Sequence, residues 1–127
     1  MPNVDMINPP GLGEVLFPYS QATRAGDLLF LAGQVALDER NAVIAPGDAY
    51  EQTVAIIDRI KLILADSGLG LENVASATVF VTSLDTLPDF NRAWAECFGE
   101  HRPARATVVA GLLIEGLVVE VQSIAVA

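Results

Sequence analysis

Two segments of the chain place apolar residues at helical spacing, and all other apolar runs are short. The first helix is expected to begin at Asp48, because Asp48 and Glu51 have the spacing of a capping box. Gly68 suits the left-handed conformation that ends many helices. The apolar stripe holds Ile56, Ile57, Ile60, Ile63 and Leu64, and the solvent side is expected to hold Glu51, Asp58, Arg59 and Asp66.

A second amphipathic helix is expected between Asp85 and Gly99. Asp85 can cap its start, Pro88 is tolerated in its first turn, and Gly99 can end it. Its apolar stripe consists of Leu87, Phe90, Trp94, Cys97 and Phe98.

The remaining apolar runs are typical of strands, which are expected at residues 27–32, 34–37, 42–44, 75–82, 106–110 and 117–126. TRAGD at residues 23–27 predicts a turn before the first strand, and DERN at 38–41 predicts the loop of a second hairpin. The resulting order, β-β-β-α-β-α-β-β, predicts a single α+β domain over residues 1–127.

Two helices with one apolar stripe each can cover only one face of a mixed sheet of about six strands. The other face stays apolar, in agreement with a composition that is 52% hydrophobic and only 18% charged. We therefore expect the protein to self-associate with its sheets turned inward around a shared axis.

The charge balance limits the classes of partner. Sixteen acidic and seven basic residues give a net charge of −9, which repels nucleic acid and anionic lipid. No run reaches the roughly 18 apolar residues of a membrane span, and the first residues lack a basic leader, so we expect a soluble, cytoplasmic protein. The single Cys97 cannot form an internal disulfide, and with His101 as the only histidine no metal site is expected.

Against this acidic background, HRPAR at residues 101–105 gathers positive charge. Pro103 keeps the chain extended and places Arg105 at the beginning of a strand, where its guanidinium suits a carboxylate. Glu120 is the one charge in the last strand, and burying it unpaired would cost several kcal/mol. Arg105, expected on the adjacent strand, is a candidate partner. A structural ion pair and a functional acid–base and anion-binding pair both remain open.

Other chemically interesting residues have ordinary structural interpretations when each is considered alone. Gly33 interrupts a strand and predicts a β-bulge. Tyr19 and Cys97 are expected to pack, and His101 to cap a turn or face solvent.

Four stretches together resemble the RidA family, also called the YjgF or reactive intermediate deaminase family. They are PYSQA (18–22), LAGQ (31–34), TVFVTSLDTLPDFNRAWAECFGEHRPAR (78–105) and LVVEVQSIAVA (117–127). The resemblance implies a fold similar to chorismate mutase of the Bacillus type, a six-stranded mixed sheet with two helices on one face. It also implies a homotrimeric barrel with three clefts between subunits.

The activity that the resemblance implies is hydrolysis of enamine and imine intermediates, such as 2-aminoacrylate and 2-iminopropionate, to 2-keto acids and ammonia without a cofactor. Arg105 would hold the substrate carboxylate, and Glu120 would position or activate the attacking water. Further residues match the cleft of the family, as a catalytic-site tyrosine or as substrate-binding positions: Tyr19, Gly33, Asn91 and Thr107.

The chain also departs from the family pattern. Ala32 and Ala106 stand where serines are frequent, Ile114 replaces a common proline, and Gln122 replaces a common glutamate. Alternative functions are therefore a non-catalytic binder of 2-keto acids or related carboxylates and an aminomuconate-type deaminase. The ribonuclease activity attached to the family name is disfavoured by the charge balance. Neither nucleic acid nor a membrane is an expected partner.

Overall fold

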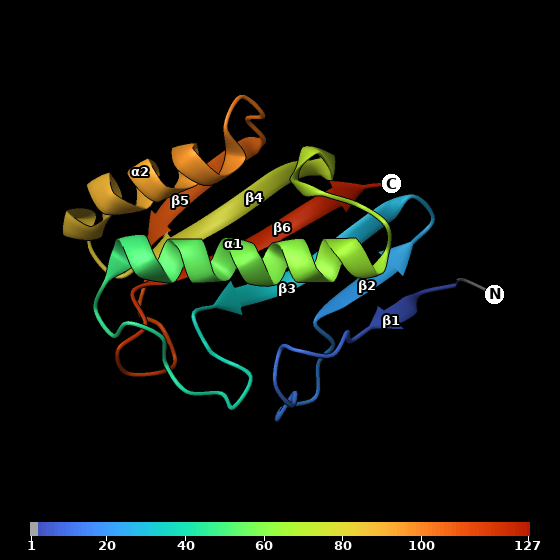
Figure 1. Cartoon of the computed structure of the whole chain (residues 1–127), viewed down its shortest axis with the longest axis horizontal. Helices are drawn as coiled ribbons and strands as arrows, with labels where there is room; N and C mark the ends of the chain where they lie inside the picture. Colours follow the sequence, from blue (N-terminus) through green and yellow to red (C-terminus); the bar gives the residue numbers. More distant parts are fainter. Residues whose placement is uncertain (1–2) are drawn as a thin grey trace.

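The computed structural model describes residues 3–127, in which six strands form one mixed sheet (Figure 1). The strands are β1 (Asp5–Ile7), β2 (Ala22–Ala25), β3 (Leu28–Val35), β4 (Val74–Val81), β5 (Ala104–Val109) and β6 (Val119–Val126). Their spatial order is β1-β2-β3-β6-β4-β5, and β4 and β5 are parallel while all other neighbours are antiparallel. The α+β architecture expected from the sequence is confirmed.

Two α-helices, α1 (Ala49–Asp66) and α2 (Leu87–Phe98), lie on the same face of this sheet (Figure 1). The Asp48 carboxylate accepts the backbone N–H of Glu51 at 3.0 Å, and Gly68 follows the helix with a φ of +73°, so both predicted ends of α1 are confirmed. No helix within residues 3–127 has the length and hydropathy needed to cross a membrane.

The start of α2 differs from the prediction, because Asp85 does not cap it. Asp85 lies in a 3-10 turn, Leu84–Thr86, that runs directly into the helix. The residue before the helix is Thr86, whose hydroxyl donates to the Ser83 carbonyl at 2.6 Å instead of capping the helix. Gly99 ends α2 as predicted, with a φ of +64°.

The first three strands also differ from those predicted. Residues 34 and 35 belong to β3, and the expected hairpin of 34–37 with 42–44 is reduced to one bridge between Leu37 and Val43. TRAGD is not entirely a turn, since its first three residues lie in β2 and the chain reverses at Gly26. The edge strand β1 was not predicted because its residues Asp5–Ile7 are largely exposed and carry no apolar pattern.

The sheet has one covered and one uncovered face. Along β6, Val119, Val121 and Ala125 are 0% exposed beneath the helices, whereas Glu120 and Gln122 point to the opposite side. On that uncovered face several large apolar side chains remain partly exposed in the monomer: Leu28, Phe30, Val108 and Val126. The expected asymmetry of the sheet is therefore present.

Candidate active site

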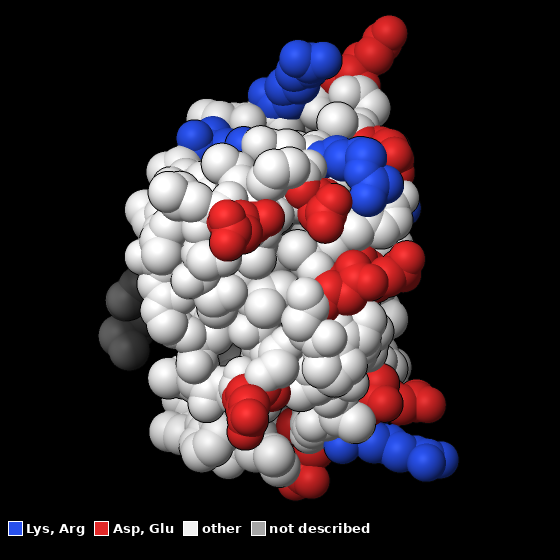
Figure 2. Space-filling view, turned by 90° about the vertical axis from the view of Figure 1, so that its left-hand side faces the viewer, with Lys and Arg blue, Asp and Glu red and all other residues white. Residues whose placement is uncertain are grey.

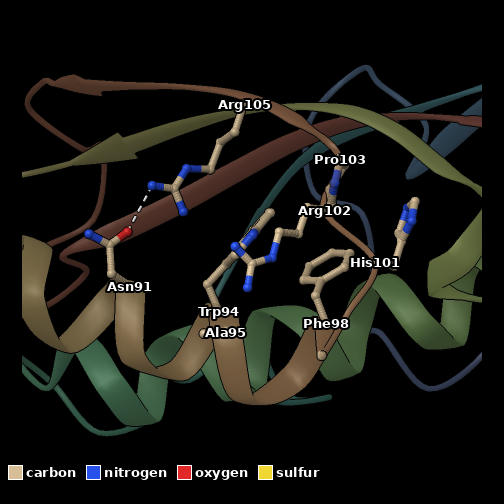
Figure 3. A pocket seen from close by; sticks show the side chains of 9 residues that line it. Asn91, Trp94, Ala95, Phe98, His101, Arg102, Pro103 and Arg105 are labelled. Carbon is tan, nitrogen blue, oxygen red and sulfur yellow. Dashed lines mark hydrogen bonds between the residues drawn. The ribbon is translucent and has the colours of Figure 1, made fainter.

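Arg105 lies near the start of β5, which is the edge strand at the opposite side of the sheet from β1. Its register partner Ala77 is 4% exposed beneath the helices, so Arg105 points to the helix side. The guanidinium donates to Asn91 Oδ1 at 2.8 Å (Figure 3) and lies 5.1 Å from the centroid of the Phe90 ring. Partial burial lowers the pKa of Arg105, but an arginine stays charged at any physiological pH.

Arg105 forms no ion pair with a carboxylate of the described residues. Within residues 3–127 the only ion pair joins Arg92 to Asp89. Asn91, on α2, supplies a neutral oxygen that orients the guanidinium and leaves its charge uncompensated. Thr107, two residues along β5, faces the same side of the sheet. The arrangement is suited to a carboxylate from outside the chain.

Glu120 lies near the start of β6, opposite Val35 on one side and Phe80 on the other. Its side chain is half-buried in a hollow of about 250 Å³ that is lined by Phe80, Leu112 and Leu113. Because this surrounding is apolar, desolvation raises the pKa of Glu120 above its usual value. A carboxylate in such a place is a stronger base than one in water.

Gly33 allows Glu120 to take this position. The pairing of β3 with β6 shifts register between Leu31 and Gln34, so the predicted bulge is confirmed. A Cβ added at Gly33 would lie 3.0 Å from the carboxyl carbon of Glu120, closer than side chains normally approach. Any larger residue would displace the carboxylate.

The segment that carries Tyr19 is held by Arg59, which the helical pattern wrongly assigned to the solvent side of α1. Arg59 donates to the Leu12 carbonyl at 3.1 Å, the Leu37 carbonyl at 2.9 Å and Gln34 Oε1 at 3.1 Å. Gln34 in turn donates to Gln21 Oε1 at 3.0 Å. Burial lowers the pKa of Arg59. These contacts tie the loop before β2 to the bulge of Gly33, while Tyr19 itself is 53% exposed.

Replacing Arg59 with methionine should lower the free energy of unfolding by about 2–4 kcal/mol, because two backbone carbonyls and Gln34 lose a charged donor. Urea unfolding at neutral pH measures the change. The matched control is Lys61→Met, since Lys61 is an exposed cation on the same helix and its loss should change stability by less than about 0.5 kcal/mol. Equal effects of the two substitutions would contradict the assigned role of Arg59.

The surroundings of His101 and Cys97 indicate structural roles for both residues. His101 Nε2 lies 2.7 Å from the Val74 carbonyl, which can only accept, so this nitrogen carries the proton. Cys97 is half-buried on α2, and burial raises the pKa of its thiol, which makes it a poor nucleophile.

The predicted site residues form two groups on different sides of the sheet. Arg105, Asn91 and Thr107 lie on the helix side at the β5 edge, whereas Glu120 with Gly33 lies on the uncovered side. The expectation that Arg105 occupies the strand next to Glu120 is wrong, because β4 lies between β5 and β6. One chain therefore does not bring the two charged groups together, although both are open to a second copy.

Comparison with known proteins shows the family to which this chain belongs. Residues 13–127 match the family described as Endoribonuclease L-PSP. A RutC family protein of Pyrococcus horikoshii is 38% identical over 108 residues, 85% of this chain and 86% of that protein. The 3-aminoacrylate deaminase RutC of Acinetobacter baylyi is 36% identical over 121 residues, 95% of this chain and 96% of that protein. The crystal structure of RidA from the Antarctic bacterium Psychrobacter has a TM-score of 0.89 at 27% identity and covers 97% of this chain and 99% of that one. As the motifs predicted, the chain belongs to the endoribonuclease L-PSP family, which includes the RidA (YjgF) and RutC proteins.

Proposed function

We propose that this protein is a deaminase that hydrolyses 2-imino acids and their enamine tautomers, of the 2-aminoacrylate and 2-iminopropionate type, to 2-keto acids and ammonia. The observation that carries the proposal is the state of Arg105. Asn91 holds its guanidinium at an edge of the sheet, and no acidic residue among residues 3–127 forms an ion pair with it. The relative named 3-aminoacrylate deaminase supports a substrate that combines an unsaturated amine with a carboxylate.

The site is proposed to lie between protomers of a homotrimer. Arg105 faces the helix side and Glu120 the uncovered side, so a site that uses both takes one group from each of two chains. The partly exposed Phe30 and Val126 on the uncovered face need a cover, which the neighbouring sheets of a closed ring supply.

The chemistry follows from these two groups. Arg105 binds the substrate carboxylate through two parallel N–H···O bonds. Glu120, as a carboxylate, accepts a proton from water while the water oxygen bonds to C2 of the iminium, and the C=N π electrons move to nitrogen. The carbinolamine then takes the proton from Glu120 at nitrogen, the C–N bond breaks and ammonia leaves. The hydroxyl gives its proton back to the Glu120 carboxylate as the keto group forms, and solvent water takes this proton from Glu120. Acid–base assistance of this kind contributes roughly 10²–10⁴-fold.

The family name invites a comparison with RNA cleavage, which the charge distribution does not favour. The net charge is −9, and the face in Figure 2 carries acidic side chains between its few basic ones, with no continuous basic surface. A phosphate chain is bound through several neutralised phosphates at once. A single substrate carboxylate needs only one well-placed guanidinium.

The test is to generate 2-aminoacrylate with a pyridoxal-phosphate dehydratase and measure the release of pyruvate. We expect acceleration by the wild type and by Arg40→Ala, a control at an exposed arginine in the loop after β3. Arg105→Ala should match the buffer blank. If the wild type also matches the blank while calorimetry shows binding of 2-keto acids, the protein is a carboxylate binder and the deaminase proposal fails.

A further inference from the structure

A pocket of about 290 Å³ opens beside Arg105, between the second half of α2 and the chain that leads into β5 (Figure 3). Asn91 and Arg105 lie at one end of it and His101 at the other. This volume is close to the lower end of the roughly 300–1,000 Å³ range of small-ligand sites. It is far more than the methyl group of 2-iminopropionate occupies.

The walls of this pocket are mainly apolar and rigid. The rings of Trp94 and Phe98 stack with their centroids 4.4 Å apart, and each residue is only 8% exposed. Pro103 lies opposite them. Such a surface suits a flat or branched apolar group better than a polar one.

The charges at this pocket are all positive. Arg102 and Arg105 both line it, and none of its lining residues is acidic. Arg102 forms no ion pair within the described residues. A ligand that matches this surface is an anion whose body is apolar.

We propose that this pocket receives the side chain of the substrate, and that the preferred substrates are 2-imino acids with a large apolar or aromatic side chain, such as those derived from leucine or phenylalanine. The inference rests on the proposed function, because it takes the substrate carboxylate to be held by Arg105. With the carboxylate there, the side chain extends along Trp94 and Phe98 toward Arg102, whose methylene groups cover it. The reacting carbon stays at the open sheet edge, where a neighbouring protomer can reach it.

Ala95 offers a way to fill the pocket without disturbing the core, since it lines the pocket and is exposed on α2. The test compares 2-aminoacrylate with the imine that an L-amino acid oxidase produces from leucine. We expect the wild type to accelerate hydrolysis of the leucine imine about 10-fold more effectively, as a few methylene groups in an apolar pocket allow. Ala95→Phe should remove this preference and leave the rate with 2-aminoacrylate within about 2-fold. The matched control, Ala65→Phe at an exposed position of α1, should retain both rates.

A binding measurement separates this inference from the proposed function. Trp94 is the only tryptophan of the chain, so its fluorescence reports directly on the pocket. The probes are pyruvate and 4-methyl-2-oxopentanoate, the 2-keto acid that corresponds to leucine. In the wild type we expect the fluorescence titration to give a Kd for 4-methyl-2-oxopentanoate about 10-fold lower than that for pyruvate, and in Ala95→Phe we expect the two Kd values to be equal.

The outcomes distinguish the two claims. Deaminase activity without a preference for the larger imine, or an equal loss of both rates in Ala95→Phe, overturns the pocket assignment while the proposed function stands. Selective binding of 4-methyl-2-oxopentanoate by a protein without deaminase activity supports the pocket and overturns the proposed function.

Discussion

Trimers assembled from equal amounts of Arg105→Ala and Glu120→Gln subunits should regain about a quarter of the wild-type deaminase activity, although each variant alone is inactive. In a cyclic trimer each site would combine Arg105 of one protomer with Glu120 of the next. With random assortment, about one site in four receives its arginine from the Glu120→Gln chain and its glutamate from the Arg105→Ala chain. The physical basis is the separation of the two groups onto different sides of one sheet, with β4 between their strands.

The unselected mixture is assayed with 2-aminoacrylate. Subunits that carry two different tags also allow mixed trimers to be isolated by two successive affinity steps, and this fraction should reach about a third of the wild-type activity, because every mixed ring of three holds one complete site. The control mixes Arg105→Ala subunits with subunits that carry both Arg105→Ala and Glu120→Gln. No site of the resulting trimers contains Arg105. Mixed trimers that stay at the level of this control would mean that the two side chains do not cooperate across an interface.

The helices were largely predictable because their signals are local. The cap of α1 at Asp48 and the reversal at Gly68 depend on residues within one turn of each helix end. Arg59 was misassigned for the opposite reason. Its three acceptors belong to Leu12, Gln34 and Leu37, more than 20 positions away, so a helical wheel cannot reveal them.

The candidate residues could be identified from sequence, but their arrangement could not. Arg105 and Glu120 could be identified because each is a charged residue beside or within an apolar strand, and this contrast is visible in the neighbouring sequence. Their placement depends on strand order. The crossover through α2 makes β5 parallel to β4 and leaves it at the edge, and β6 then pairs on the other side of β4. The two strands that carry Arg105 and Glu120, β5 and β6, are therefore not neighbours although they are consecutive in sequence.

Replacing Glu120 with glutamine should reduce deaminase activity by about 10²–10⁴-fold, because the amide cannot accept a proton from water. The same substitution should stabilise the protein at neutral pH. The carboxyl is desolvated among Phe80 and Leu112, so its pKa in the folded protein is raised above the unfolded value. Between these two pKa values the folded state binds the extra proton, and stability falls as the pH rises through this window.

Glutamine removes this penalty, so the two proteins should be equally stable in acid, below both pKa values, and diverge as the pH rises toward 7. Thermal unfolding at a series of pH values measures this divergence in stability. The kcat/KM of the wild type should rise over the same pH window in which the stability of the wild type falls. Glu115→Gln, at an exposed carboxylate in the preceding loop, is the matched control and should change neither quantity. A Glu120→Gln protein that is less stable than the wild type at pH 7 would indicate that the carboxylate is held by favourable contacts in the assembled protein. Glu120 would then have a structural role. A catalytic base in apolar surroundings is expected to lower the stability of the protein, and this cost is retained because the raised proton affinity serves the reaction.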